Sequence, residues 1–101
     1  MLDATPLLDA VDRIADRLRA APQSRLQRGA AGEGLDLARE LSARAQRLEA
    51  PDAPVREIPD AGMFTVADQV LVAGNDLAAV IRDPRELEEA VALVESVTHR
   101  V

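Results

Sequence analysis

Two pairs of side chains have the types and spacing that metal or acid–base chemistry uses. Glu95 lies four residues before His99, the only histidine, and this spacing places two metal ligands on one side of a helix. A metal ion needs further ligands from other elements. An imidazolium at the end of a helix is also favoured by the helix dipole. We therefore interpret Glu95 and His99 as a surface pair and predict no metal site.

The second pair of chemical interest is Asp68 and Asp76, which stand with Gln69 and Asn75 in the same stretch. Paired carboxylates serve general acid–base catalysis when burial or a neighbouring carboxylate moves their pKa values towards neutrality. Here they fall on the polar side of a predicted helix, where they are solvated. The sequence therefore predicts no catalytic residue.

The glycine and arginine residues between positions 25 and 34 give no phosphate-binding motif. Gly29, Gly32 and Gly34 lack the preceding strand and the Lys-Ser/Thr pair of a phosphate-binding loop, so no cofactor is predicted. Arg25 and Arg28 form a charged loop that suits docking to an acidic partner.

Charge is unevenly distributed along the chain. The net charge of −6 arises in residues 51–101, which carry four Arg and ten acids, because residues 1–50 carry eight of each. An acidic surface repels phosphate, so the distribution disfavours nucleic acid as a partner.

Composition indicates a single helical domain. The 101 residues are 48% apolar, but 19 of the apolar residues are alanines and only one is aromatic, which favours closely packed helices over strands. All 12 basic residues are Arg, as GC-rich coding in a high-GC bacterium produces. The absence of cysteine, of a signal-like N-terminus and of a long apolar run leads us to expect a cytoplasmic protein that does not enter a membrane.

The stretch 60–82 is predicted to be the central helix, with Asp60 as its N-cap. Its apolar positions continue at helical spacing straight through Gly74, which would otherwise suggest a turn. On the helix surface these positions fill an arc about twice as wide as the apolar arc of a helix that packs on one neighbour. We expect more than one helix to cover this stretch, with Gly74 at a close crossing.

Three further helices are predicted, over residues 5–21, 35–49 and 84–100. Thr5 caps the first and precedes Pro6, and Asp83 caps the last, with Pro84 at its first position and Glu86 placed to reach back to the cap amide. Residues 22–34 are predicted to be a flexible glycine-containing linker, with residues 50–59 a proline-rich linker. Within the second linker, Val55 and Ile58 are expected to cross the end of the bundle.

The predicted fold is all-α, a small four-helix bundle built from two helical hairpins. The sequence has no catalytic, cofactor or metal motif. It therefore favours a non-catalytic protein-interaction module, which would act as an adaptor, a regulator or an assembly subunit. The expected partner is either a second copy of the chain, which gives a homodimer, or another protein. The alternative is a small helical enzyme or ligand-binding protein with an interhelical pocket that uses Asp68, Asp76 and Arg side chains. Apolar residues at the margins of the last two helices are the predicted partner-binding set: Phe64, Leu71, Val72, Ala79 and Leu93.

Overall fold

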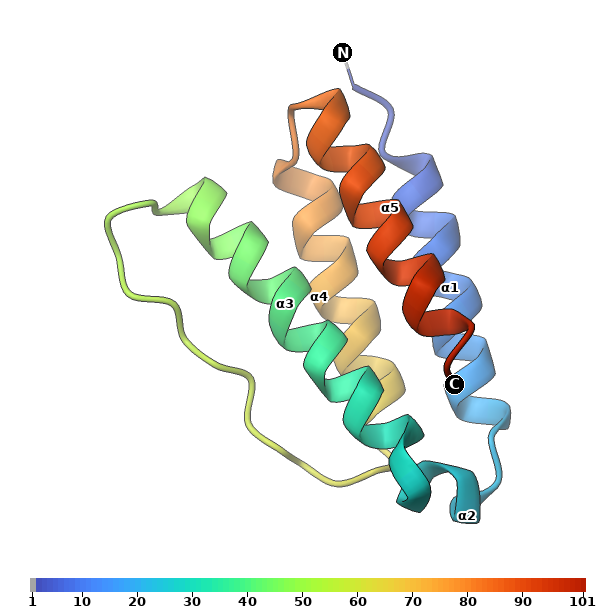
Figure 1. Ribbon diagram of the computed structural model, residues 1–101. Coiled ribbons are helices and arrows are strands. Elements are labelled where there is room, and N and C mark those ends of the chain that lie inside the picture. Colours follow the sequence, from blue (N-terminus) through green and yellow to red (C-terminus); the bar gives the residue numbers. More distant parts are fainter. Residues whose placement is uncertain (1) are drawn as a thin grey trace.

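A computed structural model describes residues 2–101 and contains helices but no strands in that range. Four helices form the bundle: α1 (Thr5–Ala20), α3 (Ala31–Glu49), α4 (Val66–Val80) and α5 (Pro84–Thr98) (Figure 1). The predicted all-α four-helix bundle is confirmed. Across residues 2–101, no helix combines the length and apolar character needed to cross a membrane.

The chain order gives two antiparallel hairpins that interleave. In Figure 1, α1 and α5 run in one direction and α3 and α4 in the other, because residues 50–65 return along the whole length of α3 before α4 begins. The most extensive helix contacts join α3 to α4, α4 to α1 and α1 to α5. The helix predicted to be central is therefore covered by two neighbours.

Gly74 lies at a close crossing of α4 and α1, as predicted. A Cβ atom added there would come within 2.5 Å of Val11 Cγ2 and 3.1 Å of Val11 Cβ. The Cβ of Val11 cannot move by side-chain rotation, so the crossing has no room for a methyl group.

The start of α4 differs from the prediction. Residues 60–65 are not helical, and the Asp60 carboxylate accepts a hydrogen bond from the amide of Gly62 instead of capping a helix. Gly62 has a φ of 97°, which turns the chain just before α4 begins at Val66. The predicted span 60–82 was too long because apolar spacing alone does not reveal this turn.

Residues 22–34 also differ, because most of the predicted linker is helical. Two short helical elements, α2 (Gln23–Arg25) and η1 (Leu26–Ala30), run directly into α3, with a kink at Gly29 where φ is 148°. Leu26, Ala30 and Gly34 are buried at four-residue intervals. Burial of this stripe holds the segment in helical conformation despite its glycines.

A carboxylate caps α5 but not α1. The N-cap of α1 is Ala4 and not Thr5, and no side chain bonds to it as a cap. Asp3, one residue earlier, accepts from the Thr5 hydroxyl (2.6 Å) and amide (3.0 Å), and these bonds lower the pKa of Asp3 below its ordinary value. At α5, the Asp83 side chain accepts from the Arg85 amide at 2.8 Å, as predicted. Glu86 makes no hydrogen bond to the cap amide within residues 2–101.

The proline-rich segment lies along the side of α3 and not over the end of the bundle. Gln46 holds it by donating to the Arg56 carbonyl (2.8 Å) and accepting from the Arg56 amide (2.9 Å). Arg39 donates to the Ile58 carbonyl at 2.8 Å, and Ile58 packs against the core. Val55 remains 43% exposed, so only half of the predicted apolar contact forms.

Replacement of Gly74 by alanine should destabilise the protein by about 1–2 kcal/mol. Overpacking against Val11 costs about 1–3 kcal/mol, which outweighs the roughly 1 kcal/mol that alanine contributes as a helix former. Gly32→Ala is the matched control, since a Cβ there meets nothing within 4 Å, and should stabilise by about 0.5 kcal/mol. Urea unfolding measures both, and equal stability of the two variants contradicts the close crossing.

Replacement of Gln46 by alanine should release the proline-rich segment without unfolding the bundle. The lost hydrogen bonds correspond to about 1 kcal/mol of local stability, so tryptic cleavage after Arg56 should accelerate about fivefold. Gln27→Ala, at an exposed glutamine on η1, is the control. Unchanged cleavage at Arg56 in Gln46→Ala argues against this anchor.

Candidate functional site

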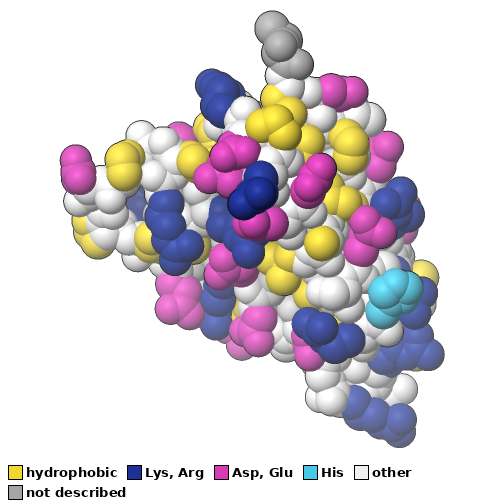
Figure 2. Space-filling model, turned by 45° about the horizontal axis from the view of Figure 1, so that its top comes forward, with side chains coloured by type: hydrophobic (Ala, Val, Ile, Leu, Met, Phe, Trp, Pro, Cys, Tyr) yellow, Lys and Arg dark blue, Asp and Glu magenta, His cyan; other side chains and the backbone are white. Residues whose placement is uncertain are grey.

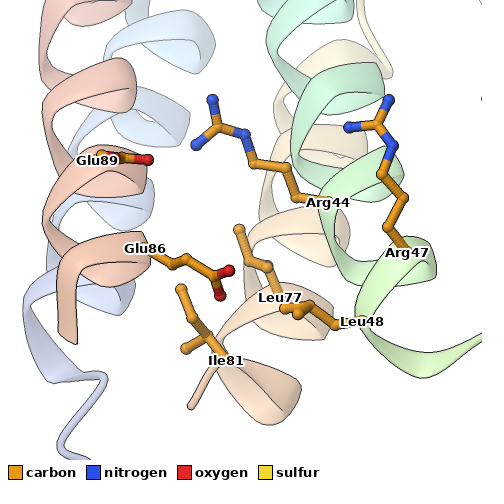
Figure 3. Close-up of a pocket in the computed structure, with 7 residues that line it drawn as sticks. All are labelled: Arg44, Arg47, Leu48, Leu77, Ile81, Glu86 and Glu89. Carbon is orange, nitrogen blue, oxygen red and sulfur yellow. The ribbon is translucent and has the colours of Figure 1, made fainter. Parts of the chain in front are cut away.

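The surface feature best suited to bind a partner is a groove between the C-terminal half of α3 and the N-terminal half of α5. Its volume is about 250 Å³, and its residues are labelled in Figure 3. One wall carries Arg44 and Arg47 from α3, and the other carries Glu86 and Glu89 from α5. Three apolar residues complete it: Leu48, Leu77 and Ile81. We call this feature the α3–α5 groove.

The base of the α3–α5 groove is apolar. Leu77 and Ile81, from the end of α4, belong to the hydrophobic core and are nearly inaccessible to solvent. Leu48 lies beside them, one residue before the end of α3, and remains 41% exposed. Leu48 is therefore the apolar side chain of the groove that a partner can still cover.

The two charged walls lie at similar heights along the groove. An ion pair between Arg100 and Glu33 (3.1 Å) joins the ends of the antiparallel helices α5 and α3. Arg44 lies 11 residues after Glu33, and Glu89 lies 11 residues before Arg100. Because Arg100 follows the end of α5 at Thr98, these counts place Arg44 near the level of Glu89 and not directly opposite it. Equal counts of 14 residues place Arg47 near the level of Glu86 in the same way.

The opposite charges of the two walls do not pair across the groove. Within residues 2–101, the ion pair formed by Arg44 is with Glu40 on its own helix, at 2.8 Å from Nε. No ion pair joins α3 to Glu86 or Glu89 in that range. The Glu86 side chain points over the apolar base, beside Leu77 and Ile81 (Figure 3). Within residues 2–101, Arg47, Glu86 and Glu89 form no ion pair, whereas Arg44 must exchange Glu40 for a molecule that enters.

The structure divides the predicted partner-binding residues into two groups. Phe64 (73% exposed) and Val72 (60% exposed) are the most exposed large apolar side chains, and Ala79 is also exposed. Leu71 and Leu93 are partly buried and pack against the core. The five residues therefore differ in how much of each side chain a partner could reach.

Charge also interrupts the exposed face of α4. Asp68, one turn before Val72, forms an ion pair with Arg19 of α1 at 2.7 Å. Figure 2 shows one side of the molecule, on which hydrophobic side chains lie scattered among charged ones of both signs. Scattered apolar residues are ordinary on soluble proteins and do not by themselves mark an interface.

The carboxylates considered for a pocket do not converge. Asp68 is exposed at its ion pair, whereas Asp76 lines a separate hollow of about 440 Å³ between α3 and the proline-rich segment. Gln46 lies in that hollow and binds Arg56 there, so the hollow is the space beneath the anchored segment. Of the predicted pocket groups, only arginines from α3 reach the α3–α5 groove.

The remaining candidate residues lie apart from one another on the surface. Arg25 ends α2 and Arg28 lies in η1, and both are exposed. Glu95 and His99 are exposed near the end of α5. Among residues 2–101, no three His, Cys, Asp or Glu side chains form a group that could hold a metal ion.

Sequence reasoning missed the residues of the α3–α5 groove. Arg44 and Arg47 stand near the end of α3, where the helix dipole already favours arginine, and Glu86 was assigned to capping, so each has a local role. Leu48 continues the apolar spacing of α3 and so does not stand out in the sequence. A signal was nevertheless present, because the Glu33–Arg100, Arg44–Glu89 and Arg47–Glu86 positions share one antiparallel register.

No protein-family model, curated protein or solved structure matches this chain.

Proposed function

We propose that this chain is a protein-interaction module and that the α3–α5 groove is its docking site. The observation that carries the proposal is an apolar base with a half-exposed Leu48, placed between two charged walls that do not pair with each other. Protein interfaces commonly combine an apolar centre with a polar rim. An apolar side chain of a partner would cover Leu48 beside the buried Leu77 and Ile81, and its polar flanks would meet the walls.

The exposed face of α4 supports the proposal less well. Phe64 and Val72 remain predicted contact residues, but the Asp68–Arg19 ion pair lies between them along the face. Displacement of that pair costs desolvation with no apolar gain. The α3–α5 groove already has its apolar atoms together, so a partner buries them at lower cost.

The alternative function, a small enzyme or ligand-binding protein, has weaker support from the same geometry. A volume of about 250 Å³ is below the roughly 300–1,000 Å³ typical of small-molecule pockets. The carboxylates that this alternative uses, Asp68 and Asp76, lie outside the groove. A protein side chain that enters from above fits the shallow shape better than an enclosed ligand does. We place this activity in the cytoplasm, whose reducing conditions suit a chain without cysteine.

Site-specific photo-crosslinking tests the proposal. A photoreactive amino acid replaces Leu48 in the full chain, which is expressed in its native cells and irradiated. Val55 is the matched control position, since it is 43% exposed against 41% for Leu48 but lies on the proline-rich segment. We expect one adduct of discrete mass at position 48 and none at position 55.

The partner in the adduct is identified by mass spectrometry, as either another protein or a second copy of this chain. Either identity supports an interaction module. No adduct at position 48, or the same adducts at both positions, contradicts docking at the α3–α5 groove.

A further inference from the structure

We propose that the partner of the α3–α5 groove is a second copy of this chain, docked about a two-fold axis that runs along the groove. This inference rests on the proposed function, because it names the partner of the same site. Three observations carry it: the opposite charges of the walls, their common register and the exposed leucine beside the apolar base.

The charges of the walls are self-complementary under this rotation. One wall is basic, with Arg44 and Arg47, and the other is acidic, with Glu86 and Glu89. A two-fold axis along the groove turns the second copy over and exchanges its left and right sides. The arginine wall of each copy then faces the glutamate wall of the other. An axis across the groove would instead bring like charges together.

The register of the walls allows all these charges to pair at once. Rotation about an axis along the groove does not change the position of a residue along that axis. Arg44 lies near the level of Glu89, and Arg47 near the level of Glu86, as counted from the Arg100–Glu33 ion pair. Each arginine of one copy therefore faces a glutamate of the other near its own level, which allows up to four intermolecular ion pairs when Arg44 exchanges Glu40 for its new partner.

Leu48 supplies the non-polar part of the contact, because Leu77 and Ile81 are already buried within one copy. Leu48 adjoins Arg47 on the α3 wall and is 41% exposed in a single copy. The two-fold rotation carries it over the α5 wall of the second copy, where the contact shields it from water. Burial of exposed apolar surface between charged rims is the usual composition of a dimer interface.

Net charge opposes the association and defines the conditions of the test. Each copy carries −6, so two copies repel at long range. At an ionic strength of about 0.15 M the Debye length is about 8 Å, which screens distant charges more than close pairs. Exposed ion pairs are individually weak. We therefore expect a dimer that forms at protein concentrations of tens to hundreds of micromolar.

Sedimentation equilibrium on charge-reversed variants of the full chain tests the inference. Arg44→Glu with Arg47→Glu makes both walls acidic, and Glu86→Arg with Glu89→Arg makes both walls basic. Each variant alone should associate at least about tenfold more weakly than the wild type, because like charges then face each other across the axis. An equimolar mixture of the two variants should recover association to within about threefold of the wild type, since acidic walls then face basic ones.

The matched control is Glu88→Arg with Glu95→Arg, which makes the same change in net charge at exposed positions of α5 that do not line the groove. This control should not lose dimer. Circular dichroism establishes that every variant folds. Recovery in the mixture also requires folded variants, so it separates lost pairing from lost structure.

Three results would overturn the inference. They are a wild-type chain that is monomeric at several hundred micromolar, variants that associate as the wild type does, and a mixture that stays monomeric. These results leave the proposed function standing if crosslinking at position 48 captures a different protein. Absence of that adduct as well removes both proposals.

Discussion

The close approach of α1 and α4 at Gly74 is the constraint from which the rest of the bundle follows. Val11 occupies the space that any side chain at position 74 would need. Because α1 lies this close on one side of α4 and α3 packs on another, α4 becomes the shared core element of the bundle. The interior is filled largely by alanine, valine and leucine, so small changes in side-chain volume alter the helix spacing.

The position of α5 explains why a groove remains. It packs mainly on α1 and has limited contact with α3, to which the Arg100–Glu33 ion pair joins it near one end. At the other end, the residues of α3 and α5 that face each other are arginines and glutamates. Closing this gap would bury four charged side chains, and their desolvation costs more than imperfect pairing recovers. The helices stay apart there, and the end of α4 forms the apolar base between them.

Sequence pattern predicted the parts of the fold that depend on local rules. The apolar spacing through Gly74 predicted a continuous buried helix, and Asp83 before Pro84 predicted the start of α5. The pattern failed where tertiary contacts decide: the burial of Leu26 and Ala30 keeps residues 23–30 helical, and the turn at Gly62 delays α4 to Val66. The α3–α5 groove lay beyond prediction because it depends on which helices pack together. The spacing of apolar residues within α3 or within α5 does not indicate that the two helices are neighbours.

The central claim is that Leu48, beside the buried base of the α3–α5 groove, is covered when the chain meets its partner, a second copy. Methyl-resolved NMR over a dilution series tests this claim most directly. The series runs from about 1 mM to about 10 µM, because exposed ion pairs stabilise a dimer only weakly and the dissociation constant is expected in this range. The account predicts that the methyl signals of Leu48, Leu77 and Ile81 shift with concentration while those of Val55 and Val72 do not. Groove methyl signals that stay constant while Val72 shifts would contradict it and would move the interface to the exposed face of α4.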